Sequence, residues 1–171
     1  MQMNFSAGNI KVLVAYDNFS SGCRAMEILK RLAGRGGVSG ELTHFMMRFD
    51  LMADATFFEL AVSEALVADM VVIATMERME LPQRVQDWVV QWILRKQDAP
   101  QALVATFEEN GNKMKEAGGV AEYLEKLAGY GRIQFFSTEG DQVRKVDFGM
   151  VKGDDWAVDS ALVRQQAAGK N

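Results

Sequence analysis

Side chains that could bind a ligand gather at three places, each directly after a short apolar run. The candidates for a ligand or an anion are Asp17, Asn18, Ser20, Ser21 and Gly22 after IKVLVAY, Thr75 and Glu77 after MVVIA, and Thr106 after ALVA. A carboxylate can hold a cation, a ribose or an arginine, and hydroxyls beside a helix start can hold an anion. The structural alternative for Asp17 is a turn shaped with Asn18, because Asp and Asn are habitual turn formers.

Other reactive residues have simpler explanations. Cys23 falls in the first turn of a predicted helix, but no histidine base is near in sequence, and a small buried hydrophobe is the favoured interpretation. Glu77, Glu80, Glu108 and Glu109 could join Asp17 around Mg²⁺, but solvated loop charge is the favoured interpretation, because loops are polar by default. His44 is the only histidine, which excludes a His-rich site. No metal site is predicted, and the catalytic residues stay unknown.

Each apolar run precedes an amphipathic one, and a doubly apolar strand followed by such a helix is the unit of a parallel sheet covered by helices. The pattern predicts helices at 20–33, 54–68, from 82 and to 128, and strands at 10–16, 42–51, 70–75, 102–107 and 133–136. Ser20 or Ser21 is the expected cap of the first helix, and Gly129 the expected end of the last.

The C-terminal part has a different pattern. VRKVDFGMV alternates and predicts an added edge strand in a hairpin around EGD, and WAVDSALVRQQ predicts a short helix. We therefore expect a domain over 1–140 and an extension over 141–171. The extension is too apolar to stay unpacked, so it should dock on the domain or on a second subunit, which predicts a homodimer.

Composition narrows the class of partner. A chain of 171 residues with a net charge of −4 fits one domain with a full core, and its lack of a basic character argues against nucleic acid. Its apolar runs are too short to cross a bilayer, and no secretory signal is visible at the start. A single cysteine fits the reducing cytoplasm.

Five strands alternating with helices over this length resemble the flavodoxin-like architecture. That resemblance implies a three-layer α/β fold with strand order 2-1-3-4-5 and a ligand site beyond the carboxyl ends of strands 1 and 3. In flavodoxins a hydroxyl-rich loop after the first strand holds the flavin phosphate. Ser21 and Gly22 match that loop, whereas Phe19 and Arg24 replace two of its hydroxyl residues.

Three further resemblances are partial. Response-regulator receivers are matched by Asp17 and Thr106, but Met76 and Glu77 stand where their phosphorylated Asp would be, and no Lys follows the fifth strand. VLVAYDNFSSGCRAMEIL is similar to the opening of universal stress proteins, without their glycine-rich loop. The YD strand and Gly-x-Arg-Ala helix are similar to bacterial proteins without an assigned activity.

These residues favour a non-enzymatic regulatory or protein-interaction domain of receiver-like, flavodoxin-like architecture, because the decisive residues of each family are missing. No cofactor is predicted. The alternative is a divergent flavin- or nucleotide-binding oxidoreductase that holds phosphate in the loop after the first strand, with FMN as its cofactor.

Overall fold

The computed structural model describes residues 9–34, 41–76, 80–96, 101–107, 119–139 and 142–145. Within these ranges the chain alternates strands and helices. The order is β1 (Ile10–Tyr16), α1 (Phe19–Gly34), β2 (Leu42–Arg48), the 3₁₀ helix η1 (Phe49–Ala53), α2 (Ala55–Val67), β3 (Met70–Thr75), α3 (Gln83–Arg95), β4 (Ala102–Phe107), α4 (Val120–Tyr130), β5 (Gln134–Glu139) and β6 (Gln142–Lys145).

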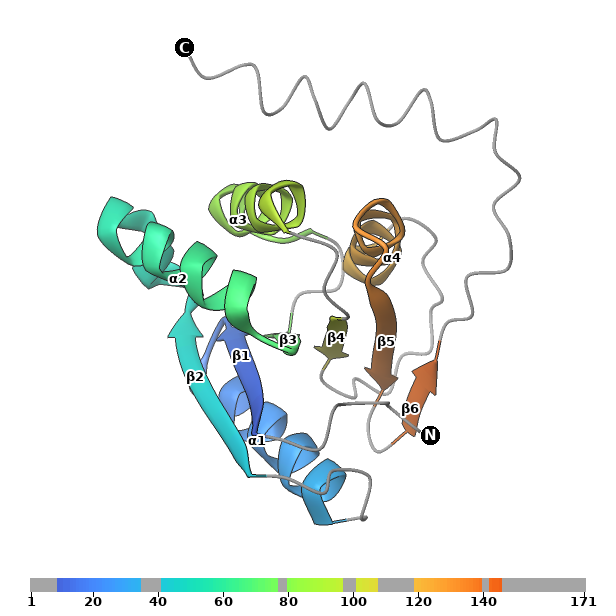
Figure 1. Cartoon of the computed structure of the whole chain (residues 1–171). Coiled ribbons are helices and arrows are strands. Elements are labelled where there is room, and N and C mark those ends of the chain that lie inside the picture. Colours follow the sequence, from blue (N-terminus) through green and yellow to red (C-terminus); the bar gives the residue numbers. More distant parts are fainter. Residues whose placement is uncertain are drawn as a thin grey trace, which may run out of the picture.

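The strands form one sheet in the order β2-β1-β3-β4-β5-β6 (Figure 1). The first five strands are parallel, and β6 pairs antiparallel with β5. The flavodoxin-like order that the sequence predicts is therefore confirmed. An added strand after the EGD turn is also present, at 142–145, whereas residues 146–151 of the predicted strand lie outside the described residues. The predicted C-terminal helix and Trp156 lie outside the described residues.

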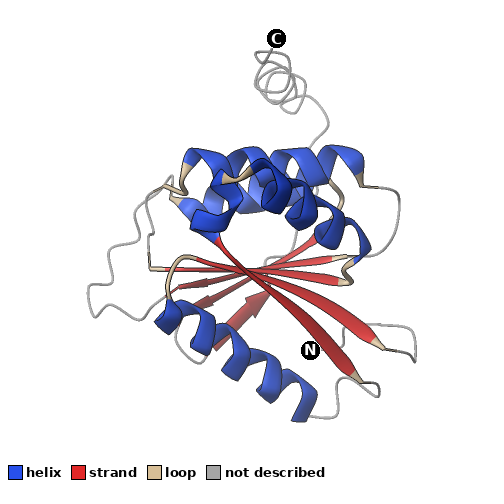
Figure 2. Ribbon diagram, turned by 90° about the vertical axis from the view of Figure 1, so that its left-hand side faces the viewer, coloured by secondary structure: helices blue, strands red, loops and turns tan. Residues whose placement is uncertain are grey.

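Helices cover both faces of the sheet. Figure 2 shows α2, α3 and α4 on one face and α1 on the other. Successive side chains of a strand alternate between faces, so Leu13 and Ile73 pack under the three helices while Val14 and Val72 pack under α1. Every residue of β3 and β4 is buried, as expected for central strands of a parallel sheet.

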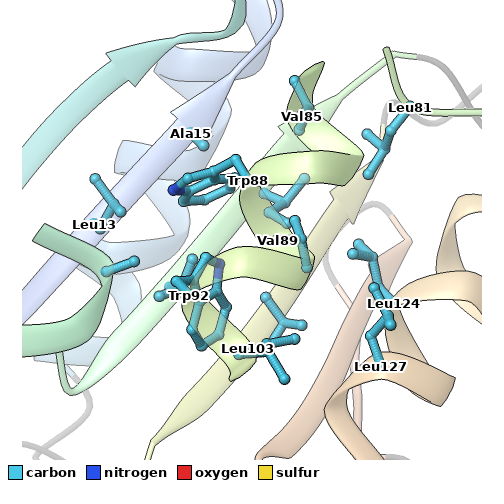
Figure 3. Close-up of a cluster of buried hydrophobic side chains, with 14 of the residues drawn as sticks. Leu13, Ala15, Leu81, Val85, Trp88, Val89, Trp92, Leu103, Leu124 and Leu127 are labelled. Atoms are coloured by element: carbon cyan, nitrogen blue, oxygen red, sulfur yellow. The ribbon is translucent and has the colours of Figure 1, made fainter. Parts of the chain in front are cut away.

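The larger part of the core is built around α3. Trp88 and Trp92 are fully buried, and their ring centroids lie 6.3 Å apart. In Figure 3 both rings lie between α3 and the strands, the Trp88 ring towards Ala15 of β1 and the Trp92 ring towards Leu103 of β4. Pro82 precedes the helix, and its carbonyl oxygen accepts hydrogen bonds from the amides of Val85 and Gln86.

The ends of two strands differ from the sequence prediction, because contacts with neighbouring elements determine where these strands stop. The predicted strand over 42–51 is too long, because the chain turns into η1 after Arg48, whose guanidinium donates two hydrogen bonds to Asp50. That guanidinium lowers the pKa of the Asp50 carboxyl. The last predicted strand is too short, because β5 follows the full length of β4 to Glu139.

The end of α4 shows a similar difference. The helix continues past the predicted cap at Gly129 and closes with two nested hydrogen bonds, Ile133 N–H to Ala128 O (2.9 Å) and Arg132 N–H to Gly129 O (3.2 Å). This closure places Arg132 in the left-handed region, with φ 52°.

No helix within the described residues is both long and apolar enough to cross a membrane.

Candidate functional site

The carboxyl ends of β1 and β3 mark the point where the chain connections diverge. After β1 the chain enters α1 on one face and continues to β2, whereas after β3 the next helix is α3 on the other face, which leads to β4 on the opposite side. In open parallel sheets this divergence leaves a crevice at the carboxyl edge, and ligands bind there. Of the candidate residues there, Asp17 and Asn18 connect β1 to α1, Ser20, Ser21 and Gly22 lie in the first turn of α1, and Thr75 is the last residue of β3.

Asp17 joins these two loops. Its Oδ2 accepts a hydrogen bond from the Thr75 hydroxyl (2.9 Å) and another from the amide of Met76 (2.7 Å). Its own amide donates to the carbonyl oxygen of Ala74 (3.1 Å). Asp17 Oδ1 is buried and has no hydrogen-bond partner in the described part of the chain. Oδ2 thus links the end of β3 to the end of β1, whereas Oδ1 makes no contact of this kind among the described residues.

Asn18 caps α1. Its Oδ1 accepts from the Ser21 amide (3.1 Å), and its carbonyl oxygen accepts from the Gly22 amide (3.0 Å). The prediction that Ser20 or Ser21 is the cap is therefore wrong, since both lie inside the helix. The Asn18 side chain thus occupies the Ser21 amide at the start of α1, one of the N–H groups to which a bound anion would otherwise accept a hydrogen bond.

The first turn of α1 lies close against the sheet. Ser21 is buried, and a Cβ atom at Gly22 would lie 3.1 Å from the ring of Tyr16. Gly22 is therefore explained by close packing of the helix on β1. Ser20 points to solvent and has an exposed side chain.

A row of four residues, three of which bear a hydroxyl, crosses the sheet near its carboxyl edge on the face that α1 covers. Tyr16, Ala74, Thr106 and Thr138 are neighbours in register on β1, β3, β4 and β5. The row before it is apolar, with Val14, Val72, Val104 and Phe136.

Thr106 and Thr138 are each 1% exposed, and neither hydroxyl has a hydrogen-bond partner among the described residues. Buried hydroxyls are normally satisfied, so this pair is unusual. The sequence points to Thr106 but not to Thr138, because Thr138 joins the row only through the extra length of β5.

Exposed apolar side chains flank the same loops. Phe19, in the first turn of α1, is 84% exposed, and Met76 is 42% exposed. Cys23 is one helical turn beyond Phe19 and is also exposed, so the prediction of a buried thiol is wrong. In the sequence Phe19 stands out only as the replacement of a flavodoxin-like hydroxyl residue, and its exposure follows from how α1 packs on the sheet.

The remaining candidates lie apart or outside the described residues. Glu77, Glu108 and Glu109 belong to the latter group. Glu80 is exposed and accepts a hydrogen bond from Gln86 Nε2 (3.3 Å). His44 is an exposed residue of β2. Within the described ranges no three His, Cys, Asp or Glu residues are grouped so that they could hold a metal ion.

No protein-family model matches this chain, and no curated protein is significantly similar to it in sequence. The class of protein is therefore defined by the fold alone: a parallel, three-layer α/β domain with the flavodoxin-like strand order.

Proposed function

We propose that this chain is a non-enzymatic regulatory or protein-interaction domain that binds a protein partner at the carboxyl edge of its sheet. The observation that carries the proposal is the exposure of Phe19 and Met76 beside the loops where related architectures bind ligands. Large apolar side chains held in solvent at such a position are typical of a contact surface.

The polar residues of the same loops support this proposal. Asp17 connects Thr75 and Met76, and Asn18 caps α1, so both side chains stabilise the edge. A receiver-like phosphorylation cycle lacks its acceptor, because Met76 follows β3 directly. The edge is then a rigid base for apolar contacts.

The setting is part of the proposal. A single free and exposed thiol at Cys23 suits a reducing cytoplasm, and we propose a bacterial, cytoplasmic protein that works as a homodimer. We propose no role in binding nucleic acid, because the chain has a net charge of −4, and no role at a membrane.

Site-specific photo-crosslinking in the cells that make the protein tests the contact surface. A photoreactive phenylalanine analogue replaces Phe19 in one variant and Lys30 in the other, because Lys30 is also exposed on α1. We expect a discrete protein adduct from position 19 that disappears with Met76→Asp, and no such adduct from position 30. Equal adducts from both positions, or none from position 19, would contradict the proposal.

A second candidate is a binding site for flavin or nucleotide, with the loop after β1 near the phosphate. The observation that favours it is the pair of buried hydroxyls, Thr106 and Thr138, without hydrogen-bond partners in the described residues. Native mass spectrometry and the absorbance of the purified protein test for a retained ligand. Amide shifts of Ser20, Ser21 and Gly22 on titration with FMN or ATP would favour this candidate over the first.

A further inference from the structure

The outer edge of β2 is an unpaired edge of the sheet. β2 is the end strand, and no described strand pairs with its other side (Figure 1). The Ile10 amide donates to the carbonyl oxygen of Glu41 (2.9 Å), and Ile10 lies opposite Leu42 in the register. In a parallel ladder with this register, the N–H and C=O groups of Leu42, His44 and Met46 point away from β1. They form a row of donors and acceptors to which another extended chain can bind.

β2 lacks the features that normally protect a sheet edge from such pairing. Natural edge strands are protected by lysine, by proline or by bulges. The sequence of β2, LTHFMMR, contains neither lysine nor proline, and its pairing with β1 continues from Leu42 to Arg48 without a bulge. The guanidinium of Arg48 is already paired with Asp50. The edge of β2 is therefore open to the addition of a strand.

The helix α2 presents an apolar side towards this edge. α2 packs on β1 and on α3, and the ion pair of Glu59 with Arg95 (3.3 Å) marks the side of the helix that faces α3. Phe57, Leu60 and Glu64, which we call the α2 border, follow one another at spacings of four and three on the opposite side, towards β2. Phe57 is 42% and Leu60 38% exposed. Two large apolar side chains thus remain uncovered beside the edge of the sheet.

The edge strand itself continues this apolar surface. Phe45 of β2 lies opposite Leu13 of β1, on the face that α2 covers, and it is half-buried against the core there. A strand added to β2 would lie beside Phe45 and below the α2 border. Its side chains on this face would contact apolar groups on two sides, which is the contact that stabilises neighbouring strands in a sheet.

Glu64 determines the charge that an occupant should carry. The side chain is half-buried and has no ion pair with a described residue, whereas Glu59 on the α3 side of the helix is paired with Arg95. Covering Glu64 with an apolar strand is unfavourable unless a cation pairs with the carboxylate. A second copy that paired β2 with β2 about a two-fold axis would bring a second Glu64 to the contact instead. A different chain that carries lysine or arginine fits this edge better.

We propose that the outer edge of β2 binds an extended segment of a partner protein, which adds a further strand to the sheet. The segment packs apolar side chains on Phe45 and on the α2 border, and its lysine or arginine pairs with Glu64. This surface is different from the Phe19 and Met76 edge, and either proposal can fail without the other.

Selection of peptides on the full chain tests whether the edge binds. The probe is a phage library of random peptides of about twelve residues, enough for one strand. We expect enriched peptides that contain lysine or arginine among alternating apolar residues and that slow hydrogen exchange at the amides of Leu42, His44 and Met46. No enriched peptide, or enriched peptides that leave these amides unchanged, overturns the proposal. The same holds if these amides are already protected in the free protein, because a second copy or another part of the chain then covers the edge.

Backbone methylation tests whether the bound peptide is a strand. Two versions of a selected peptide carry N-methyl groups at alternate amides, one version along each edge of the extended chain. One version should bind as the parent does, and the other at least about tenfold more weakly, because only one edge pairs with β2. Equal binding of the two versions, whether strong or weak, contradicts strand addition.

Charge reversal tests the role of Glu64. Glu64→Lys should raise the dissociation constant of the selected peptide at least about tenfold, and replacing the basic residue of the peptide by glutamate should restore binding to this variant. Glu27→Lys, the matched control at an exposed residue of α1 on the other face of the sheet, should leave the constant unchanged. If Glu64→Lys binds the original peptide as tightly as the wild type does, the proposed pairing is wrong.

Discussion

At the scale of single residues, polar groups at the strand ends act mainly on the fold itself. Asp17 accepts hydrogen bonds from Thr75 and Met76, which lie 58 and 59 positions further along the chain. Asn18 caps the helix that follows. Two donors on one carboxylate oxygen fix the orientation of the Asp17 side chain. The contribution of these two hydrogen bonds to the free energy of unfolding can therefore be measured by substitution.

Asp17→Ala should reduce the free energy of unfolding by about 2–3 kcal/mol, because it leaves the Met76 amide and the Thr75 hydroxyl without their acceptor. Thr75→Val is the matched variant and should cost about 1 kcal/mol, since the Met76 contact remains. Urea melts of both variants measure the difference. A smaller loss of unfolding free energy in Asp17→Ala than in Thr75→Val would show that the Asp17 carboxylate does not stabilise the fold.

Tyr123 gives the molecule a dependence on alkaline pH. Burial, reinforced by the negative charge of Asp87, raises the pKa of Tyr123 to about 12. In the unfolded chain the phenol ionises near pH 10, so the folded state keeps the proton longer. The resulting stabilisation is complete below about pH 10 and is lost as the pH rises towards 12.

Wild type should therefore lose about 1 kcal/mol more than Tyr123→Phe between about pH 9 and 11.5, a figure reduced for the partial exposure of the ring. Urea melts at both values for both proteins provide the comparison. Parallel losses in the two proteins would mean that the phenol of Tyr123 titrates alike in the folded and unfolded states.

At the scale of elements, the apolar runs fix the strands better than they fix the element ends. The bounds of β1, β3 and β4 are those the sequence predicts, because β3 and β4 are buried on both sheet faces and β1 is buried along most of its length. β2 ends where η1 begins, and β5 extends as far as β4 offers a pairing partner. Both ends depend on tertiary contacts, which the local sequence pattern does not contain.

The candidate site follows the same division. Residue types alone indicate Asp17, Thr75 and Thr106 as candidates. They do not indicate the hydrogen bond from Thr75 to Asp17 or the position of Thr138 beside Thr106, because both depend on which strands are neighbours in the sheet. Phe19 could be noticed in the sequence, whereas its exposure depends on how α1 packs.

The end of α4 carries a measurable strain. Arg132 has φ 52°, a region that costs a residue with a side chain about 1 kcal/mol relative to glycine. Arg132→Gly should therefore stabilise the protein by up to about 1 kcal/mol, as measured in a urea melt. Gly131→Ala, its neighbour, should destabilise, because the new Cβ would lie 3.0 Å from both Ile93 and Ile133. Equal effects of the two variants would contradict this account of the helix end.

At the scale of the whole molecule, stability should decrease from the centre of the sheet to its edges. The amides of Val71–Ala74 in β3 are covered by β1 and β4 and by helices on both faces, so their hydrogen exchange should require global unfolding. The amides of β2, the end strand, should exchange faster through local opening. Exchange followed by NMR separates the two, and equal protection in β2 would show that its edge is covered in solution.

The position of β1 between β2 and β3 has a consequence for the chain while it is being made. A ribosome delivers β1 and β2 first, and β1 then has one paired edge and one open edge until β3 has left the exit tunnel. The interval between the end of β2 and the end of β3 lasts about one to five seconds at ordinary rates of synthesis. During that time an apolar strand is open to pairing with a neighbouring nascent chain. Crowded polysomes are therefore the place where this fold is most exposed to misassembly, and chaperones that hold short nascent chains would act on it there.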